Sequence, residues 1–147
     1  MRSDEHHPPT YNDADLVLRL YELRRDPVLR ESRASMVAKF WPSSFEELMQ
    51  VTKADHPLNA AYRQTTSYWE LAYSIARYGI VNPDFLMESG GEGLLIFARV
   101  HPYLDQLRAT FSPRSFRNAE WIATNCDAGR QIFAAMQQRV AAHFASK

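Results

Sequence analysis

The sequence predicts an all-α protein, a single-domain irregular bundle of six to eight helices with a central aromatic-rich helix. Apolar side chains recur with a period of about 3.6 residues from residue 12 to the end of the chain. Residues that cap helices, several of them followed by proline, separate the periodic stretches. No stretch of alternating apolar and polar residues bounded by turns indicates a β-strand.

Composition agrees with one folded domain. The chain has 147 residues, 46% of them hydrophobic and 12% aromatic, which is enough to bury a single core. Its 17 basic and 17 acidic residues cancel, and this balance argues against a nucleic-acid partner. We expect residues 1–11 to form a flexible arm, because they mix charge, two histidines and two prolines without periodicity, and residues 12–147 to form the helical domain.

The first two helices are predicted from their caps. Asn12 or Asp13 caps the first helix, whose apolar stripe is Leu16, Val17, Leu20 and Leu23. Asp26 then caps a second helix that begins at Pro27 and runs to about Trp41, where Pro42 ends it.

The next two helices lead to the centre of the bundle. Ser43 and Glu46 form a capping-box pattern for a short helix that ends near Val51. Another helix extends from Pro57 to Gly79, a C-terminal cap in the left-handed region. Its apolar arc is very wide, which indicates a helix with neighbours on several sides. The members of this arc are Leu58, Ala61, Tyr62, Thr65, Tyr68, Trp69, Ala72, Tyr73, Ile75 and Ala76.

Four helices are expected after Gly79, in nearly half of the chain. Asn82 caps a short helix over 83–88, and a longer one follows over 94–111, kinked near 98–101 by Pro102. Two further helices are predicted over 115–124 and 127–145.

No pattern identifies catalysis, a cofactor or a metal ion. Cys126 is the single cysteine, the histidines are scattered except for an N-terminal pair, and no Glu-x-x-His motif occurs. His101 and Asp105 are one turn apart and so form a possible acid–base pair, although a hydrogen bond from His101 to a carbonyl freed by Pro102 is the preferred interpretation. No segment resembles a signal peptide or a membrane span, so we expect a soluble cytoplasmic protein that does not bind a membrane.

Several segments between Asp15 and Phe111 resemble an uncharacterised bacterial family of small all-helical proteins, a domain of unknown function. The segments that carry the resemblance are 27–33 (PVLRESR), 68–72 (YWELA), 77–81 (RYGIV) and 101–108 (HPYLDQLR). The resemblance implies a helical domain with no established activity and supplies no catalytic residue. Some members of the family are anchored to membranes through an added N-terminal helix, a feature that this sequence does not show.

Two functional hypotheses follow. The first is a non-catalytic interaction or scaffold module that binds itself or another protein. The last helix favours a homodimer, because it combines an alanine-rich side (Ala134, Ala135, Ala141, Ala142) with a stripe of larger apolar residues (Phe133, Met136, Val140, Phe144). The alternative is a small-molecule-binding bundle, or an unrecognised enzyme, with a site at the central helix. Its candidate residues are Arg33, Trp69, Glu70, Tyr73 and His101.

The sequence also predicts a buried ion pair between Arg33 and Glu70. Arg33 projects into the apolar stripe of its helix, where an unpaired guanidinium group is costly. Glu70 is the only acidic residue between Pro57 and Gly79. Two alternatives compete: Arg63 or Arg77 pairs with Glu70, or Arg33 extends its head to water.

Overall fold

The computed structural model describes residues 5–147, and these residues contain helices and no strand. The elements, which confirm the all-α prediction, are α1 (Tyr11–Leu23), α2 (Pro27–Lys39), α3 (Phe45–Val51), α4 (Asn59–Arg77), α5 (Pro83–Met87), α6 (Glu92–Val100), the 3₁₀ helix η1 (His101–Tyr103), α7 (Leu104–Thr110), α8 (Arg117–Asn125) and α9 (Asp127–Ala145).

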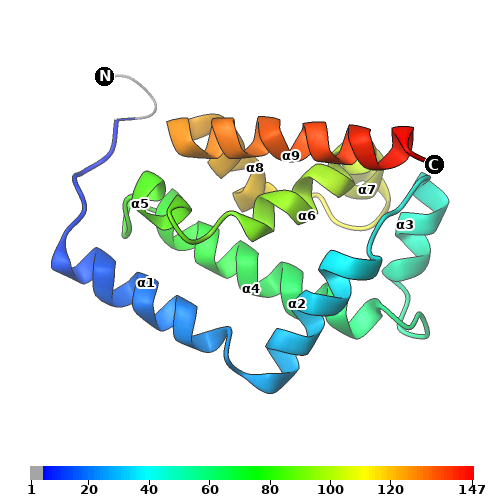
Figure 1. The fold of residues 1–147 in the computed structure, drawn as a ribbon, viewed down its shortest axis with the longest axis horizontal. Helices are drawn as coiled ribbons and strands as arrows, with labels where there is room; N and C mark the ends of the chain where they lie inside the picture. The colour runs from blue at the N-terminus through cyan, green and yellow to red at the C-terminus, as the bar shows by residue number, and fades with distance from the viewer. Residues whose placement is uncertain (1–4) are drawn as a thin grey trace.

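The central position of α4 is confirmed. It packs against α2, α5, α6 and α8, and it lies between α1 and α2 on one side and α6 and α9 on the other (Figure 1). Its aromatic side chains Tyr62, Tyr68, Trp69 and Tyr73 are all buried. The wide apolar arc of this helix therefore forms the middle of the core.

Most helix boundaries follow the predicted caps. Asp26 and Asn82 accept hydrogen bonds at the starts of α2 and α5, and Gly79 has a φ angle of +77° after the end of α4. The cap of α1 differs from the prediction, because Thr10 accepts the hydrogen bond from the Asp13 backbone N–H. The Asp13 carboxylate is buried and accepts a 2.8 Å hydrogen bond from the backbone N–H of Asn82.

The capping box of α3 lies one residue later than predicted. Ser44 accepts a hydrogen bond from the backbone N–H of Glu47, and the Glu47 carboxylate accepts one from the backbone N–H of Ser43 at 2.7 Å. The bond from Glu47 N–H to the serine hydroxyl is the predicted one, shifted by one residue because two consecutive serines allow either frame, whereas the Glu47 carboxylate reaches the residue before the cap.

Pro102 interrupts the long helix predicted over 94–111. The structure forms α6, a single 3₁₀ turn and α7, because proline cannot supply the backbone N–H that a continuous helix needs. The predicted number of six to eight helices treats α6, η1 and α7 as one kinked helix. In addition, α6 begins at Glu92, two residues earlier than predicted.

The first part of the expected arm, residues 1–4, lies outside the described residues. Residues 5–10 contain neither helix nor strand. The His6 ring lies 3.0 Å from the carbonyl oxygen of Asn125, and Asn82 Nδ2 donates to the His7 carbonyl at 2.6 Å. Across residues 5–147, no helix combines the length and the apolar character needed to cross a bilayer.

Candidate functional site

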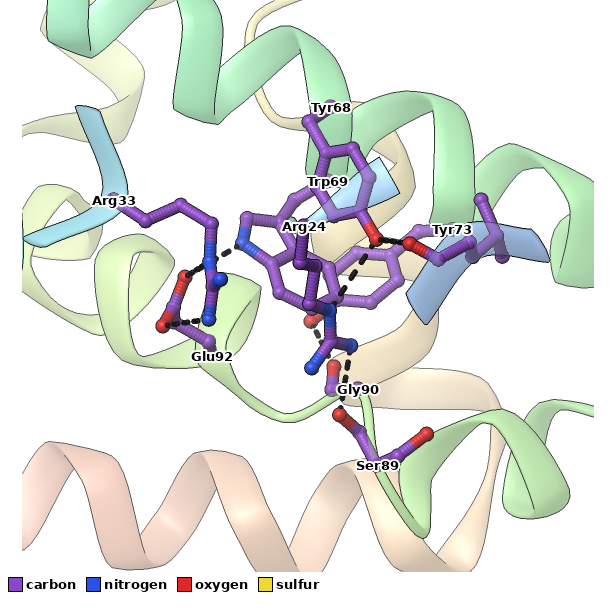
Figure 2. Close-up of polar contacts among 9 residues, drawn as sticks. Arg24, Arg33, Tyr68, Trp69, Tyr73, Ser89, Gly90 and Glu92 are labelled. Atoms are coloured by element: carbon purple, nitrogen blue, oxygen red, sulfur yellow. Dashed lines mark hydrogen bonds and ion pairs between the residues drawn. The ribbon is translucent and has the colours of Figure 1, made fainter. Parts of the chain in front are cut away.

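Arg33 forms a two-point ion pair with Glu92. Arg33 Nε donates to Glu92 Oε1 at 2.8 Å, and Nη2 donates to Oε2 at 3.0 Å (Figure 2). The two side chains, from the middle of α2 and the first turn of α6, are 20% and 21% exposed. The hydrogen bond to Glu92 favours the charged guanidinium and raises the pKa of Arg33 above its usual value, although burial opposes this.

Trp69 and Arg24 extend this pair into a cluster. Trp69 Nε1 donates to Glu92 Oε1 at 3.1 Å, so one carboxylate oxygen accepts from both α2 and α4. The Arg24 guanidinium lies 4.7 Å from the centre of the Trp69 ring and donates to the carbonyl of Ser89 at 2.8 Å (Figure 2). The cluster thereby connects the end of α1, α2, α4 and the turn before α6.

Two tyrosines of α4 anchor the same region. The Tyr73 hydroxyl donates to the carbonyl of Gly90 at 2.6 Å, and the Tyr68 hydroxyl donates to the carbonyl of Leu20. A Cβ atom on Gly93 would lie 2.5 Å from the Tyr73 hydroxyl oxygen, so the close approach of α6 to α4 requires glycine there. Burial raises the pKa of Tyr73 well above its ordinary value, which keeps the hydroxyl protonated as a donor.

The predicted pair between Arg33 and Glu70 is wrong. Consecutive residues on a helix point about 100° apart, so Trp69 faces Glu92 while Glu70 faces α8. The Glu70 carboxylate accepts hydrogen bonds of 3.0 Å from the backbone N–H groups of Asn118 and Ala119. Burial raises the pKa of Glu70, while these hydrogen bonds act in the opposite direction.

His101 lies apart from the cluster around Glu92 and from the contacts of Glu70 with α8. Its ring is exposed and contacts the rings of Phe97 and Phe133 at centroid distances of 5.5 and 5.2 Å. Within residues 5–147 the ring makes no hydrogen bond, either to Asp105 or to a carbonyl freed by Pro102. The five candidate residues are therefore found in three places: Arg33, Trp69 and Tyr73 around Glu92, Glu70 beneath α8, and His101 at η1.

The side chains of the polar cluster bind one another. The cavity lined by Trp69 and Glu70 lies on the other side of Trp69, between α4, α6 and α8, and holds about 10 Å³, close to the minimum for one water molecule. Both oxygens of Glu92 already accept hydrogen bonds. These contacts hold the Glu92 carboxylate in place and connect α2, α4 and α6.

A second buried arginine was not foreseen. Arg99, in α6, is 4% exposed, and its Nη1 donates to three carbonyls at the end of α2, each at 3.0 Å. Its guanidinium lies 3.5 Å from the centre of the Trp41 ring. The sequence feature that could have indicated this buried arginine is its position inside the apolar stretch 94–100. Glu92 follows two glycines and lies between the helices predicted over 83–88 and 94–111, so the sequence pattern does not mark it as a partner for Arg33.

Metal ligands do not gather in the described part of the chain. No group of three or more His, Cys, Asp or Glu side chains there is arranged to hold an ion. The Cys126 thiol is buried, and burial raises its pKa to about 11, so it is a poor nucleophile.

One side of α9 is left uncovered. The inner side of α9 packs on α5, α6 and α8, with Phe133 stacked on Phe97 at a centroid distance of 5.1 Å. The outer side from Gln131 to Ala145, which we call the α9 outer face, is exposed and carries no charged residue; the exposed Asp127 lies on the same side, one turn before it. Its members are Gln131, Ala134, Ala135, Gln138, Ala141, Ala142 and Ala145.

The comparisons with known proteins identify a family without a function. The sequence model of DUF4760, a domain of unknown function, matches residues 9–126, which include α1–α8 and exclude α9. No curated protein and no solved structure matches the chain significantly. The match covers most of the chain and confirms the resemblance to an uncharacterised family. The chain therefore belongs to the DUF4760 family, whose function is unknown.

Proposed function

We propose that this protein is a non-catalytic helical interaction module that pairs with a second copy of itself through the α9 outer face. The observation that carries the proposal is the composition of that face. Over the length from Gln131 to Ala145, about 21 Å at 1.5 Å per residue, it presents only alanine and glutamine. Exposed helix faces on soluble domains ordinarily carry charged side chains.

A two-fold partner suits such a face. On a two-fold axis a patch meets itself, so each charge tends to approach a like charge, and an uncharged patch avoids this repulsion. Alanine side chains also let two helix backbones approach closely. The only charged side chain between Gln131 and Ala145 is Arg139, which lies at the flank of the face.

The position of α9 in the chain supports the same proposal. The family match ends at Cys126, and the fully buried apolar residues of the core all precede α9, which adds partly buried side chains such as Ile132 and Phe133. Larger apolar residues of α9 pack against the rest of the domain, as Phe133 does against Phe97. The alanines of the α9 outer face are exposed and are available to a partner. Cys126, buried and unpaired, supports a cytoplasmic location, where thiols stay reduced.

Sedimentation velocity tests this proposal. We expect a 17.0 kDa monomer at low concentration and a species of twice that mass as concentration rises from about 1 µM to 1 mM. The variant Ala134→Glu/Ala141→Glu should remain monomeric throughout. The matched control is Ala34→Glu/Ala38→Glu, which places the same charges on exposed positions of α2 and should dimerise as the wild type does. A wild-type chain that stays monomeric over the whole range would contradict the proposal.

A further inference from the structure

A cavity of about 310 Å³ lies where the end of α4, α7 and the outer side of α8 meet. It is separate from the Arg33–Glu92 cluster and from the α9 outer face. Its wall contains three half-buried arginines, Arg77, Arg108 and Arg117, and one carboxylate, Glu120, and therefore carries a net charge of +2. The other lining residues are Pro113, Trp121, Thr124 and Asn125.

Two of these arginines have no carboxylate in direct contact within residues 5–147, although Glu70 attracts Arg117 at longer range. Arg77 Nη1 donates to the side-chain oxygen of Asn118 at 3.3 Å, and Arg117 Nη2 donates to the Tyr78 hydroxyl at 3.0 Å. Both partners are neutral, so the two positive charges are not compensated by a direct contact. A guanidinium carries five N–H donors, and most of those on these two side chains remain available.

The third arginine contains a buried donor without a partner. Arg108 Nε donates to the carbonyl of Ser115 at 3.0 Å, and Nη1 contacts Glu120 Oε1 at 3.1 Å. Arg108 Nη2 is buried and has no hydrogen-bond partner. Because Nη2 has no solvent-accessible surface, its missing partner does not lie in the open cavity, and Arg108 contributes only its positive charge to the wall.

We propose that this cavity binds a small phosphomonoester. Near neutral pH a phosphomonoester carries up to two negative charges, which match the net charge of the wall, and its oxygens accept paired hydrogen bonds from guanidinium groups. Trp121 and Pro113 form an apolar side of the cavity against which the organic part packs. The volume is at the lower end of the range for ligand pockets, which limits that part to a small group.

Calorimetric titration with phenyl phosphate, inorganic phosphate and benzoate tests the proposal. Phenyl phosphate combines the dianion with a flat apolar group and should bind most tightly. Inorganic phosphate lacks the ring and benzoate lacks the second charge, so each should bind about tenfold more weakly or worse. Benzoate binding as tightly as phenyl phosphate would overturn the assignment to phosphate, and no heat with phenyl phosphate at millimolar concentration would overturn the site.

Paired variants locate the binding. Arg77→Gln/Arg117→Gln should weaken phenyl phosphate binding at least about tenfold. The control Arg25→Gln/Arg30→Gln removes the same charge from exposed positions near α2 and should bind like the wild type. Equal weakening in both pairs would indicate a general effect of net charge and overturn the site. If the first pair fails to fold, Arg117→Lys, which keeps the charge and loses the fork of donors, should still weaken binding several-fold.

A Glu120 variant separates ligand binding from a purely structural role. Glu120→Gln removes the carboxylate that competes for Arg108, while the bond from Arg108 to Ser115 keeps the side chain in place. Phenyl phosphate should therefore bind several-fold more tightly to this variant. Unchanged or weaker binding would contradict the placement of the phosphate beside Arg108.

Discussion

Helices α2 and α6 are linked by two arginines that are held in different ways. Arg33, from α2, meets the carboxylate of Glu92 and is 20% exposed. Arg99, from α6, meets three backbone carbonyls and the face of Trp41, without a carboxylate, and is 4% exposed. The more deeply buried cation is thus the one that lacks an acidic partner.

The difference shows that the end of a helix can take the place of a counter-ion. Carbonyls at a helix C-terminus carry the negative end of the helix dipole, and an aromatic face attracts a cation. The two environments have opposite effects on the arginine pKa. Hydrogen bonding to Glu92 raises the pKa of Arg33, whereas burial lowers the pKa of Arg99 to about 10.

Glu70 completes the comparison with the reverse charge. Its carboxylate is held by two backbone N–H groups in the first turn of α8, the positive end of that helix. Arg99 and Glu70 therefore each attach one helix to the terminus of another. Of these three residues, only Arg33 uses an ion pair between two side chains.

Replacing Arg99 should have the largest effect. Arg99→Met removes charged hydrogen bonds to α2 and the contact with Trp41, and we expect a loss of about 3–4 kcal/mol in the free energy of unfolding. Urea denaturation measures this loss. Arg99→Lys keeps a positive charge but not the planar stack, and it should recover less than half of the difference. A loss below about 1 kcal/mol in Arg99→Met would mean that the helix end does not replace a counter-ion.

Replacing Arg33 or Glu92 should have a smaller effect, because both side chains are partly hydrated. Arg33→Met and Glu92→Gln should each destabilise by about 2 kcal/mol, with a coupling energy of about 1 kcal/mol in a double-mutant cycle. The cycle of Arg33→Met with Glu70→Gln is the control. The effects of these two substitutions on the free energy of unfolding should be additive, since the Arg33 and Glu70 side chains lie on different sides of α4.

Glu70→Gln should cost about 1 kcal/mol near neutral pH, since glutamine offers one acceptor oxygen to α8 instead of two. The pH dependence has a definite sign. Burial raises the pKa of Glu70 above its ordinary value of 4.5, so its contribution to stability is complete below that pH and decreases as pH rises through the folded value. Urea denaturation should show a larger wild-type advantage at pH 4 than at pH 7. An advantage that grows with pH would show that hydrogen bonds from α8 outweigh burial.

Salt should produce the smallest effect and should distinguish the two arginine contacts. The Arg33–Glu92 pair is partly exposed, so added salt should screen it and reduce its coupling energy by about 0.5 kcal/mol between low and 1 M NaCl. The destabilisation caused by Arg99→Met should change little, because that guanidinium is shielded from solvent. Equal sensitivity of the two contacts would remove the distinction between them.

The helices themselves were determined locally and could be predicted from the sequence. Asp26 and Asn82 cap α2 and α5, and Gly79 ends α4, because side-chain hydrogen bonds and a positive φ depend on residues close in the chain. The central place of α4 also followed from its wide apolar arc. Where two neighbouring residues have the same side chain, as at Ser43 and Ser44, the sequence does not decide which of them caps the helix.

The partners of the buried charges were decided by the tertiary structure. Sequence spacing placed Arg33 on an apolar face and correctly required a partner, but the choice between Glu70 and Glu92 depended on how α4 is rotated in the bundle. A rotation of one residue, about 100°, separates Trp69 at one site from Glu70 at another. Every residue has a backbone carbonyl, so the sequence does not indicate which carbonyls bind Arg99. Only the packing of α2 against α6 determines them.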